Sequence, residues 1–169
     1  MQQTYWTNRT FNFDFPAGLF PVIIGRLKGA YPRIADLTED ISKRKLIEQP
    51  DGKWSIQEHI GHLTDLEELH RGRIDDFKNN EKTLRAWDGL NLKTKEAHHN
   101  EKSIDELLKE FYNVRSEFID GFLSFNDAEL IRTAIHPRLN IPMRVVDMAF
   151  FVAEHDDHHI AKIIEIKLY

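Results

Sequence analysis

The sequence predicts an all-α protein that folds as a four-helix bundle. Four segments of about 20 residues or more carry apolar side chains at helical spacing, and two of them begin with the capping sequence S-x-x-E. No two segments show the paired alternation of a convincing β-hairpin. Amphipathic helices of this length bury their apolar faces against one another, so a bundle is the arrangement that we expect.

Length and composition predict one domain that spans residues 1–169. Apolar residues make up 41% of the 169 residues and charged residues 30%, which is typical of a globular protein with a single core. No apolar run approaches the roughly 20 residues of a membrane span, and the first residues contain no apolar secretory signal. We therefore expect a cytoplasmic protein with no membrane partner.

The net charge and the absence of cysteine exclude several classes of function. The net charge is −5 and no basic stripe is interleaved with aromatic residues, so we expect no nucleic-acid partner. The chain contains no cysteine, which excludes disulfides, thiolate zinc sites and a cysteine nucleophile. A bound metal would therefore need histidine, aspartate or glutamate ligands.

Residues 1–15 are expected to form an extended N-terminal arm. Phe11, Phe13 and Phe15 alternate with Asn12 and Asp14, which is the period of an extended segment with one buried face. The buried face could cover the core of the same domain or a partner subunit.

The first helix is predicted over residues 17–38. Its apolar residues recur at helical spacing, and Pro32 can kink or divide it. A polar connection over 39–53 follows and ends in a turn formed by Pro50-Asp51-Gly52.

The second helix is predicted to begin with a capping box formed by Ser55 and Glu58. Its apolar stripe continues to about Asn79. The polar residues 80–102 are expected to form a long loop.

The third helix, over 103–124, is predicted to begin with a second capping box, formed by Ser103 and Glu106. A second long connection covers 125–141. The fourth helix is expected to begin near Pro142, a residue suited to a first turn, and to be the most buried of the four. Both long connections leave room for parallel neighbouring helices.

The last helix carries the candidate functional residues in the stretch FVAEHDDHHIAKIIEI (151–166). His155 and His159 are four residues apart, so they lie on one face of the helix, at the edge of its apolar side, and can bind one ion. This is not the zinc-protease motif H-E-x-x-H, because Asp156 stands in place of the glutamate. His158 falls on the polar side and is expected to be a solvated surface residue, and Asp157 is assigned no role.

Asp156 projects near the middle of the apolar face, where a carboxylate costs free energy unless it is paired or hydrogen-bonded. It could orient an imidazole, bind a metal directly, or form a purely structural pair. The sequence leaves these alternatives open.

A third imidazole would come from the second helix, which carries His59, His62 and His70. Helical periodicity places His59 and His70 nearer the centre of the apolar stripe and His62 on its flank. The spacing by itself therefore slightly favours the other two over His62.

The stretches WSIQEHIGHLTDLE (54–67) and HDDHHIAKI (155–163) together resemble the DinB-like (YfiT-like) superfamily. The resemblance covers nearly the whole chain and implies a four-helix bundle in up-down-down-up order, as well as a homodimer. In that family a tryptophan leads to a histidine-leucine pair eight residues later, which corresponds here to Trp54 and His62. The resemblance thus implies that His62, His155 and His159 bind the metal.

Three imidazoles leave a divalent ion with an open position at which water or a thiol can be activated. Zinc is the ion that we expect, nickel also suits an all-imidazole set, and iron or manganese would be compatible. The resemblance implies a metal-dependent hydrolase, or a transferase that uses a low-molecular-weight thiol, acting on a small-molecule substrate. Many members have Gly-Gln where this chain has Ala161-Lys162, so no particular reaction is transferred.

The alternative is a non-catalytic bundle with a structural metal or a His/Asp network, acting as a binding or dimerisation module. An open metal position that faces a pocket would favour the enzyme, whereas a fourth protein ligand or a closed site would favour the alternative.

Acid–base candidates are few. Glu58 and Asp156 are the catalytic candidates, although the capping box is the preferred role of Glu58. Trp54 could line the pocket or only support the start of its helix, and Asp65 is expected to be solvated. Loops 80–102 and 125–141 would shape the pocket, and no functional role is assigned to the remaining histidines, His70, His98, His99 and His136.

Overall fold

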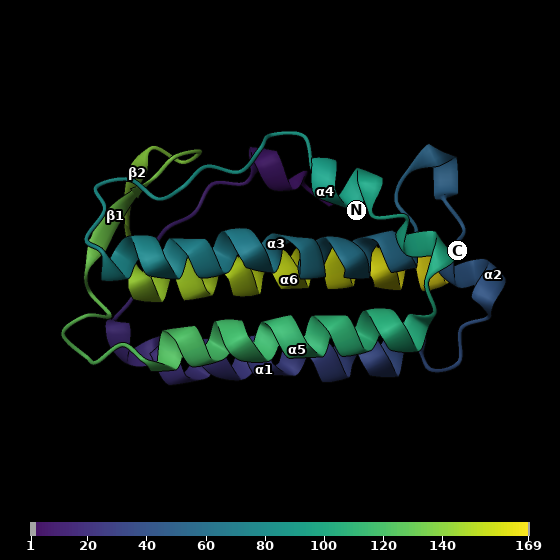
Figure 1. The fold of residues 1–169 in the computed structure, drawn as a ribbon, viewed down its shortest axis with the longest axis horizontal. Helices are drawn as coiled ribbons and strands as arrows, with labels where there is room; N and C mark the ends of the chain where they lie inside the picture. Colours follow the sequence, from purple (N-terminus) through teal and green to yellow (C-terminus); the bar gives the residue numbers. More distant parts are fainter. Residues whose placement is uncertain (1–2, 169) are drawn as a thin grey trace.

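Four long helices form the body of the protein (Figure 1). They are α1 (Phe20–Thr38), α3 (Ile56–Lys78), α5 (Ile104–Leu123) and α6 (Val145–Leu168). In this computed structural model, which describes residues 3–168, α3 packs against α5 and α6, and α1 packs against the same two helices. Each helix therefore has two neighbours, and the predicted four-helix bundle is confirmed.

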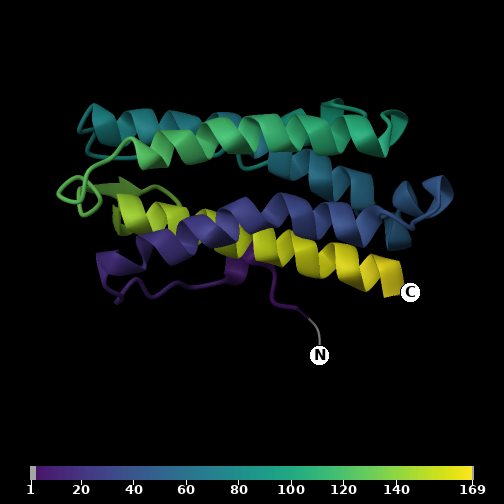
Figure 2. The ribbon, with the colours of Figure 1, turned by 90° about the horizontal axis from the view of Figure 1, so that it is seen from below.

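The helices run in two directions. In Figures 1 and 2, α1 and α6 run from left to right, whereas α3 and α5 run from right to left. Two parallel helices need a long connection, and residues 79–103 supply it between α3 and α5. This connection carries the short helix α4 (Leu92–Glu96) and a 3-10 turn (His99–Glu101), so the predicted long loop is partly helical.

The N-terminal ends of α3 and α5 lie where the capping sequences place them. Ser55 Oγ accepts a hydrogen bond from the Glu58 N–H (3.1 Å), and the Glu58 carboxylate accepts one from the Ser55 N–H (2.7 Å). Ser103 Oγ caps α5 by accepting from the Glu106 N–H (3.2 Å), but among the described residues the Ser103 N–H makes no return hydrogen bond to the Glu106 carboxylate, so the second predicted capping box forms only in part. Pro32 lies within α1, which continues through it.

The predicted start of the last helix is wrong. Pro142 lies in strand β2 (Ile141–Arg144), which pairs antiparallel with β1 (Thr133–His136), so the expectation that the chain has no strand pair is also wrong, although the fold is mostly helical. The hairpin was missed because each strand has only four residues. A proline is compatible with a strand at the edge of a sheet as well as with a helix start.

The α6 helix begins immediately after the hairpin. Its first N–H groups need acceptors, and the Asp147 carboxylate accepts from the backbone N–H of Arg144 (2.8 Å) while its oxygens also bind the Arg144 guanidinium. The hairpin and the helix therefore share one rigid junction.

The apolar core is divided into two clusters by a belt of buried polar residues. On α5, Phe111 belongs to one cluster and Phe118 to the other, and Arg115 lies between them. On α3, Glu67 likewise lies between Leu63 of one cluster and Ile74 of the other. On α6, Asp156 lies between Ala153 and Ile160, which also belong to different clusters.

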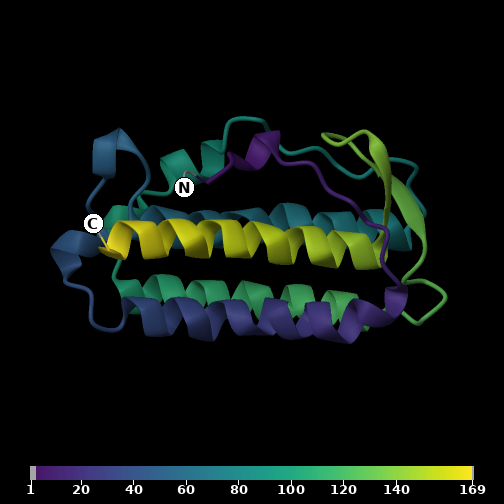
Figure 3. The same ribbon diagram turned by 180° about the vertical axis from the view of Figure 1, so that it is seen from behind.

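The N-terminal arm packs on its own bundle. Phe13 and Phe15 are half-buried, and their ring centroids lie 6.4 and 5.1 Å from that of Phe150 on α6. Asn12 and Asp14 are exposed, so the predicted alternation is confirmed. The arm includes a short 3-10 turn, Trp6–Asn8, and runs beside α6 in Figure 3.

Within residues 3–168, none of the helices is long and apolar enough to cross a membrane.

Candidate metal centre

Three histidines from two helices converge at the face of the bundle formed by α3 and α6. His62, His155 and His159 are all buried, and each offers a ring nitrogen within 4.8 Å of the others. The Nε2 atoms of His155 and His159 lie 3.0 Å apart. Two nitrogen ligands of one tetrahedral zinc ion, at bond lengths of about 2.1 Å, lie about 3.4 Å apart, so these two rings need to separate only slightly to hold an ion.

Neighbouring side chains fix which nitrogen of each ring faces the centre. Thr94 Oγ1 is hydrogen-bonded to Nδ1 of His62 (3.1 Å), and Nδ1 of His59 faces Nδ1 of His159 (2.8 Å). Because the Nδ1 atoms are engaged, the Nε2 atoms of His62 and His159 are free to bind an ion. Nδ1 of His155 is buried and has no hydrogen-bond partner among the described residues.

Burial keeps these rings neutral. Removal from water lowers the pKa of His62 to about 3 and that of His59 to about 4. It also lowers the pKa of His155 and of His159 well below the ordinary value, and the neighbouring imidazoles add to the effect. Neutral imidazoles carry the lone pairs that metal binding needs, so the donor set fits a divalent ion without prior loss of protons.

The structure brings His62, and not His59, together with His155 and His159. Helical periodicity slightly favoured His59 and His70; His59 lies beside the set, with its Nδ1 2.8 Å from Nδ1 of His159. We call these four side chains, His59, His62, His155 and His159, the imidazole cluster.

A cavity of about 480 Å³ lies in front of the imidazole cluster. Helices α3 and α6 form its floor, and three segments overlie it: the N-terminal arm, the connection between α3 and α5, and the β1–β2 turn (Figure 1). The cavity is not enclosed, and three of the residues that line it, Tyr5, Thr7 and Ala86, are exposed, so it is accessible from solvent. The overlying segments contribute Tyr5, Trp6, Thr7, Ala86, Trp87, Asn91, His136, Pro137 and Arg138.

Both predicted pocket loops therefore contribute to the cavity, whereas the contribution of the N-terminal arm was not anticipated. Trp6 lies with its ring centroid 4.8 Å from that of His155. Trp54, which could have been only a support for the start of α3, lines the cavity and lies against His62 (4.6 Å between centroids). No signal in the sequence connects Trp6 with residues about 150 positions away in the chain.

Asp156 is explained by an arginine that the sequence analysis did not single out. Both Asp156 oxygens accept from the Arg115 guanidinium, and Arg115 Nε donates to Glu67 Oε1 (2.6 Å). All three side chains are almost fully buried. Asp156 thus forms a structural pair, and within residues 3–168 no hydrogen bond joins it to an imidazole. We call Glu67, Arg115 and Asp156 the ionic cluster.

Arg115 could have been found from the sequence. It lies four residues after Phe111 and three before Phe118, on the inward face of the third helix. A cation on that face requires an anion on a facing helix, and Asp156 and Glu67 occupy the corresponding positions.

Neither catalytic carboxylate candidate lines the cavity. Both oxygens of Glu58 are engaged at the start of α3, by the Ser55 N–H and by Gln49 Nε2, and these hydrogen bonds lower the pKa of Glu58 against the opposing effect of burial. Asp156 points into the ionic cluster.

The structure buries several histidines to which the sequence analysis assigned no functional role, and it half-buries His158, which was expected to be solvated. His158 is half-buried beneath the arm, where Gln3 Nε2 binds its Nδ1 (3.0 Å), and it lines the cavity. His99 and His136 are buried although they lie in connecting segments, and His70 is buried on α3. His98 is exposed, as expected.

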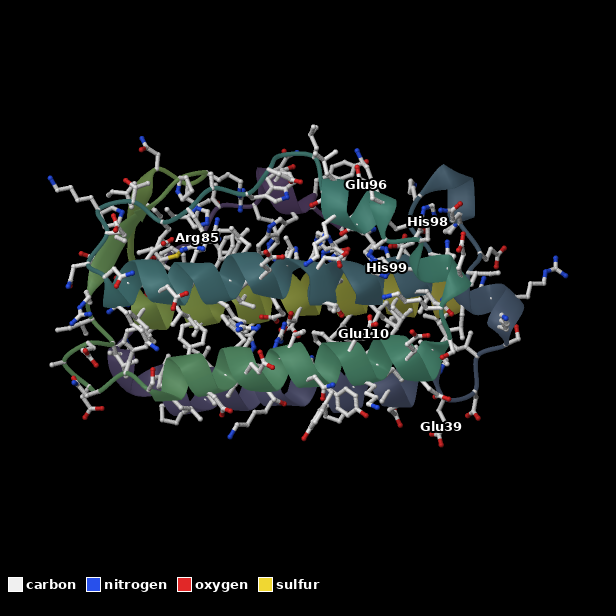
Figure 4. The ribbon with its side chains drawn as sticks, in the orientation of Figure 1. Glu39, Arg85, Glu96, His98, His99 and Glu110 are labelled. Atoms are coloured by element: carbon white, nitrogen blue, oxygen red, sulfur yellow. The ribbon has the colours of Figure 1, made fainter. Side chains whose placement is uncertain are left out.

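His99 explains how the connection is held on α3 (Figure 4). Its Nε2 is hydrogen-bonded to Asp65 (2.8 Å), so Asp65 is engaged rather than solvated. The ring lies against Gly61, where an added Cβ would come within 2.3 Å of it. Gly61 is therefore needed for the close approach that also brings Thr94 to His62.

Comparisons with known proteins identify the family of the chain and agree with its fold. A family model described as the DinB superfamily matches residues 26–163, most of the chain. Among solved structures, the fold is similar to that of YfiT from Bacillus subtilis, with a TM-score of 0.72 and 18% identity, over 94% of this chain and 91% of that one. YfiT is described as a probable metal-dependent hydrolase with an unusual four-helix bundle topology. No curated protein matches the chain.

Proposed function

The chain belongs to the DinB superfamily, and we propose that it is a metal-dependent hydrolase whose ion is held by His62, His155 and His159. The observation that carries the proposal is that the three converging imidazoles face a cavity accessible from solvent. The description of YfiT as a probable metal-dependent hydrolase supports the same reaction class.

The non-catalytic alternative required a fourth protein ligand or a closed site. Asp156, the fourth ligand that the sequence analysis considered, is engaged by Arg115, and His59 lies outside the converging set. The cavity volume of about 480 Å³ is within the range of small-molecule sites. Both observations favour an open coordination position and a bound substrate.

A zinc ion held there would supply Lewis acidity, which lowers the pKa of a water molecule or of a substrate thiol. Thr94 and His59 keep the ring nitrogens aimed at the ion. Trp6, Trp54 and Phe151 provide aromatic walls that limit the water around it.

Three further expectations belong to the same proposal: zinc rather than nickel, a homodimer in the cytoplasm, and the up-down-down-up order of the helices. The helix directions in Figure 1 support the last of these. Transfer of a low-molecular-weight thiol is the second reaction to assay, because an imidazole-bound ion can also activate a thiol and the chain has no cysteine of its own.

The test begins with metal content. The purified protein is loaded with zinc, dialysed and analysed for metal, alongside His62→Ala, His155→Ala and His159→Ala. His158→Ala is the matched control, because it alters a half-buried histidine of the same run that is not in the converging set. We expect the wild type and the control to retain about one ion and the three variants to lose it.

Activity follows on the zinc-loaded protein, with a panel of amides and esters and, separately, with a low-molecular-weight thiol and electrophilic acceptors. Metal-dependent hydrolysis that is lost in His62→Ala supports the proposal. Metal retention in all three variants would refute the site, and a loaded protein inactive in both panels would support the non-catalytic alternative.

A further inference from the structure

One wall of the cavity is cationic. Arg73 and Arg138 line it together with His136, and Lys162 lies at the rim near the imidazole cluster. None of the described residues that line the cavity is an aspartate or a glutamate, although the chain as a whole has a net charge of −5. The charge of the cavity is therefore opposite to that of the protein.

Arg73 is the most deeply buried of these cations, with an exposed fraction of 3%. Its Nε donates to the backbone oxygen of Arg85 (3.0 Å). The nearest carboxylate, Asp76, instead binds the guanidinium of Arg85 (2.8 Å), a side chain that reaches from the connection towards α3 in Figure 4. Burial lowers the pKa of Arg73 to about 10, so it still carries its charge at neutral pH.

Arg138 extends from the β1–β2 turn over two aromatic rings. Its guanidinium lies 5.7 Å from the ring centroid of Trp6 and 5.6 Å from that of Phe151, and Nη1 donates to the Thr7 oxygen (3.1 Å). The other terminal nitrogen, Nη2, is buried and has no partner among the described residues. Arg138 is thus held in place with one donor unused.

His136 adds a neutral donor at the same wall. Its Nδ1 accepts from the Leu139 N–H (3.2 Å), so the neutral ring carries its proton on Nε2. That Nε2 is buried and also lacks a partner among the described residues. Burial and the charges of Arg73 and Arg138 keep the ring neutral by lowering its pKa to about 3.

We propose that Arg73, Arg138 and His136 form a subsite for an oxyanion, a carboxylate or phosphate group of the substrate. The buried guanidinium of Arg73 and the half-buried guanidinium of Arg138 form no salt bridge with a carboxylate among the described residues, so part of their desolvation cost remains for an oxyanion to offset. Its oxygens would also satisfy the two unused donors, Arg138 Nη2 and His136 Nε2.

The position of this subsite restricts the shape of the substrate. Arg138 stacks on Phe151, which precedes His155 by four residues on α6, about 6 Å along the helix. Leu66, Leu69 and Trp87 line the cavity with apolar or aromatic surface. One substrate molecule would then place its anionic end at this subsite, an apolar segment in the cavity, and its reacting bond at the three imidazoles. This shape of the substrate, unlike the anion binding itself, rests on the proposed function.

Anion binding is tested on the chelator-treated protein, so that no metal contributes. The probes are hexanoate and phenyl phosphate, each compared with an uncharged counterpart, hexanamide or phenol. Binding is followed by calorimetry and by the fluorescence of the tryptophans that line the cavity. We expect at least one anion to bind ten times more tightly than its neutral counterpart; which anion binds identifies a carboxylate or a phosphate as the group recognised.

Arg138→Gln and Arg73→Met are expected to weaken binding of that anion at least tenfold. Arg71→Met is the matched control, because Arg71 is an exposed residue of the same helix that pairs with Glu117 outside the cavity. Since Arg73 is buried, the half-buried Arg138 provides the variant that is expected to fold normally. Equal binding of charged and neutral probes, or unchanged binding in Arg138→Gln, would overturn the proposal.

The proposed metal site and the proposed oxyanion subsite can each be disproved without the other. His62→Ala is expected to lose zinc and to bind the anion as the wild type does, whereas Arg138→Gln is expected to retain zinc and lose the anion. Loss of both ligands in Arg138→Gln, with its thermal unfolding unchanged, would also contradict a separate oxyanion subsite.

Discussion

His155 and Asp156 are consecutive residues of α6, yet they belong to two clusters that are satisfied in opposite ways. Asp156 faces the bundle interior, where both its oxygens accept hydrogen bonds from Arg115. His155 faces the cavity, where its Nε2 lies against Nε2 of His159 and its Nδ1 has no partner among the described residues. The ionic cluster provides its own counter-charges, whereas the imidazole cluster leaves donor atoms for a group from outside the chain.

The ionic cluster therefore contributes to the stability of the fold, whereas the imidazole cluster is suited to bind a ligand. A buried charge that the chain itself pairs helps to select one packing of the helices, because removal of any partner leaves an uncompensated ion. Buried lone pairs that the chain leaves unpaired are retained at a cost, and a ligand offsets that cost. The one exception in the ionic cluster is Glu67 Oε2, which faces Nδ1 of His70 at 3.8 Å, beyond hydrogen-bonding distance.

The largest effect is expected from breaking the ionic cluster. Arg115→Met leaves Asp156 and Glu67 buried without a cation, so the free energy of unfolding should fall by about 3–5 kcal/mol. Urea denaturation measures this, with Arg71→Met as the control. Arg71 forms an exposed pair with Glu117, and its loss should cost less than about 1 kcal/mol.

A second variant distinguishes lost charge pairing from lost packing. Replacing all three members, as Arg115→Met, Glu67→Met and Asp156→Leu, removes the uncompensated charges and should recover most of the lost stability. If Arg115→Met is no more costly than Arg71→Met, the ionic cluster does not have the stabilising role assigned to it.

The second largest effect is expected from disrupting the contact between His99, in the connection, and Gly61 on α3. In Gly61→Ala the new Cβ would lie 2.3 Å from the His99 ring, so the connection must move, at a cost of about 1–3 kcal/mol in the free energy of unfolding. Gly25→Ala is the control, because its Cβ meets nothing within 4 Å and alanine is the better helix former. Thermal unfolding should show opposite shifts for the two variants; equal stabilisation would mean that His99 does not pack against Gly61.

The orienting groups of the imidazole cluster are expected to act on metal affinity rather than on stability. His59→Ala and Thr94→Val remove the contacts to Nδ1 of His159 and of His62, so zinc affinity should fall by about tenfold to a hundredfold. Titration against a competing chelator measures the loss, with the exposed His98→Ala as the control. Complete loss of zinc in His59→Ala would make His59 a ligand instead.

The sequence predicted the helices well because their signals are local. The capping box of Ser55 and Glu58 and the spacing of His155 and His159 depend on residues within one or two helical turns. The choice of His62 over His59 depends on how α3 faces α6, which periodicity does not resolve, and only the family resemblance identified it.

Features that depend on distant segments could not be predicted in the same way. The hairpin that positions His136 and Arg138 has strands of four residues, too short for a periodic signal. Trp6 reaches His155 across most of the chain length, and nothing local indicates that contact. The cationic wall of the cavity is built from such segments and therefore emerges only from the three-dimensional structure.

The last expected effect concerns the protonation of His136, at the cationic wall of the cavity. The folded-state pKa of His136 is about 3, below its ordinary value of 6.5, because burial disfavours the charged ring. Between these values the unfolded chain binds one more proton, so the free energy of unfolding falls as the pH falls below 6.5, by up to about 1.4 kcal/mol per pH unit. Above pH 7 the ring is neutral in both states and has no effect.

His136→Gln keeps a polar side chain and removes this titration. In chelator-treated protein, urea denaturation between pH 5 and 8 should give curves that run parallel above pH 7 and diverge below 6.5, with the shallower slope in the variant. The remaining slope would come from the other buried histidines, since His59 and His62 also have pKa values lowered by burial. Parallel curves over the whole range would mean that folding does not lower the pKa of His136, so that the ring is neutral above its ordinary value of 6.5 and cationic only below it.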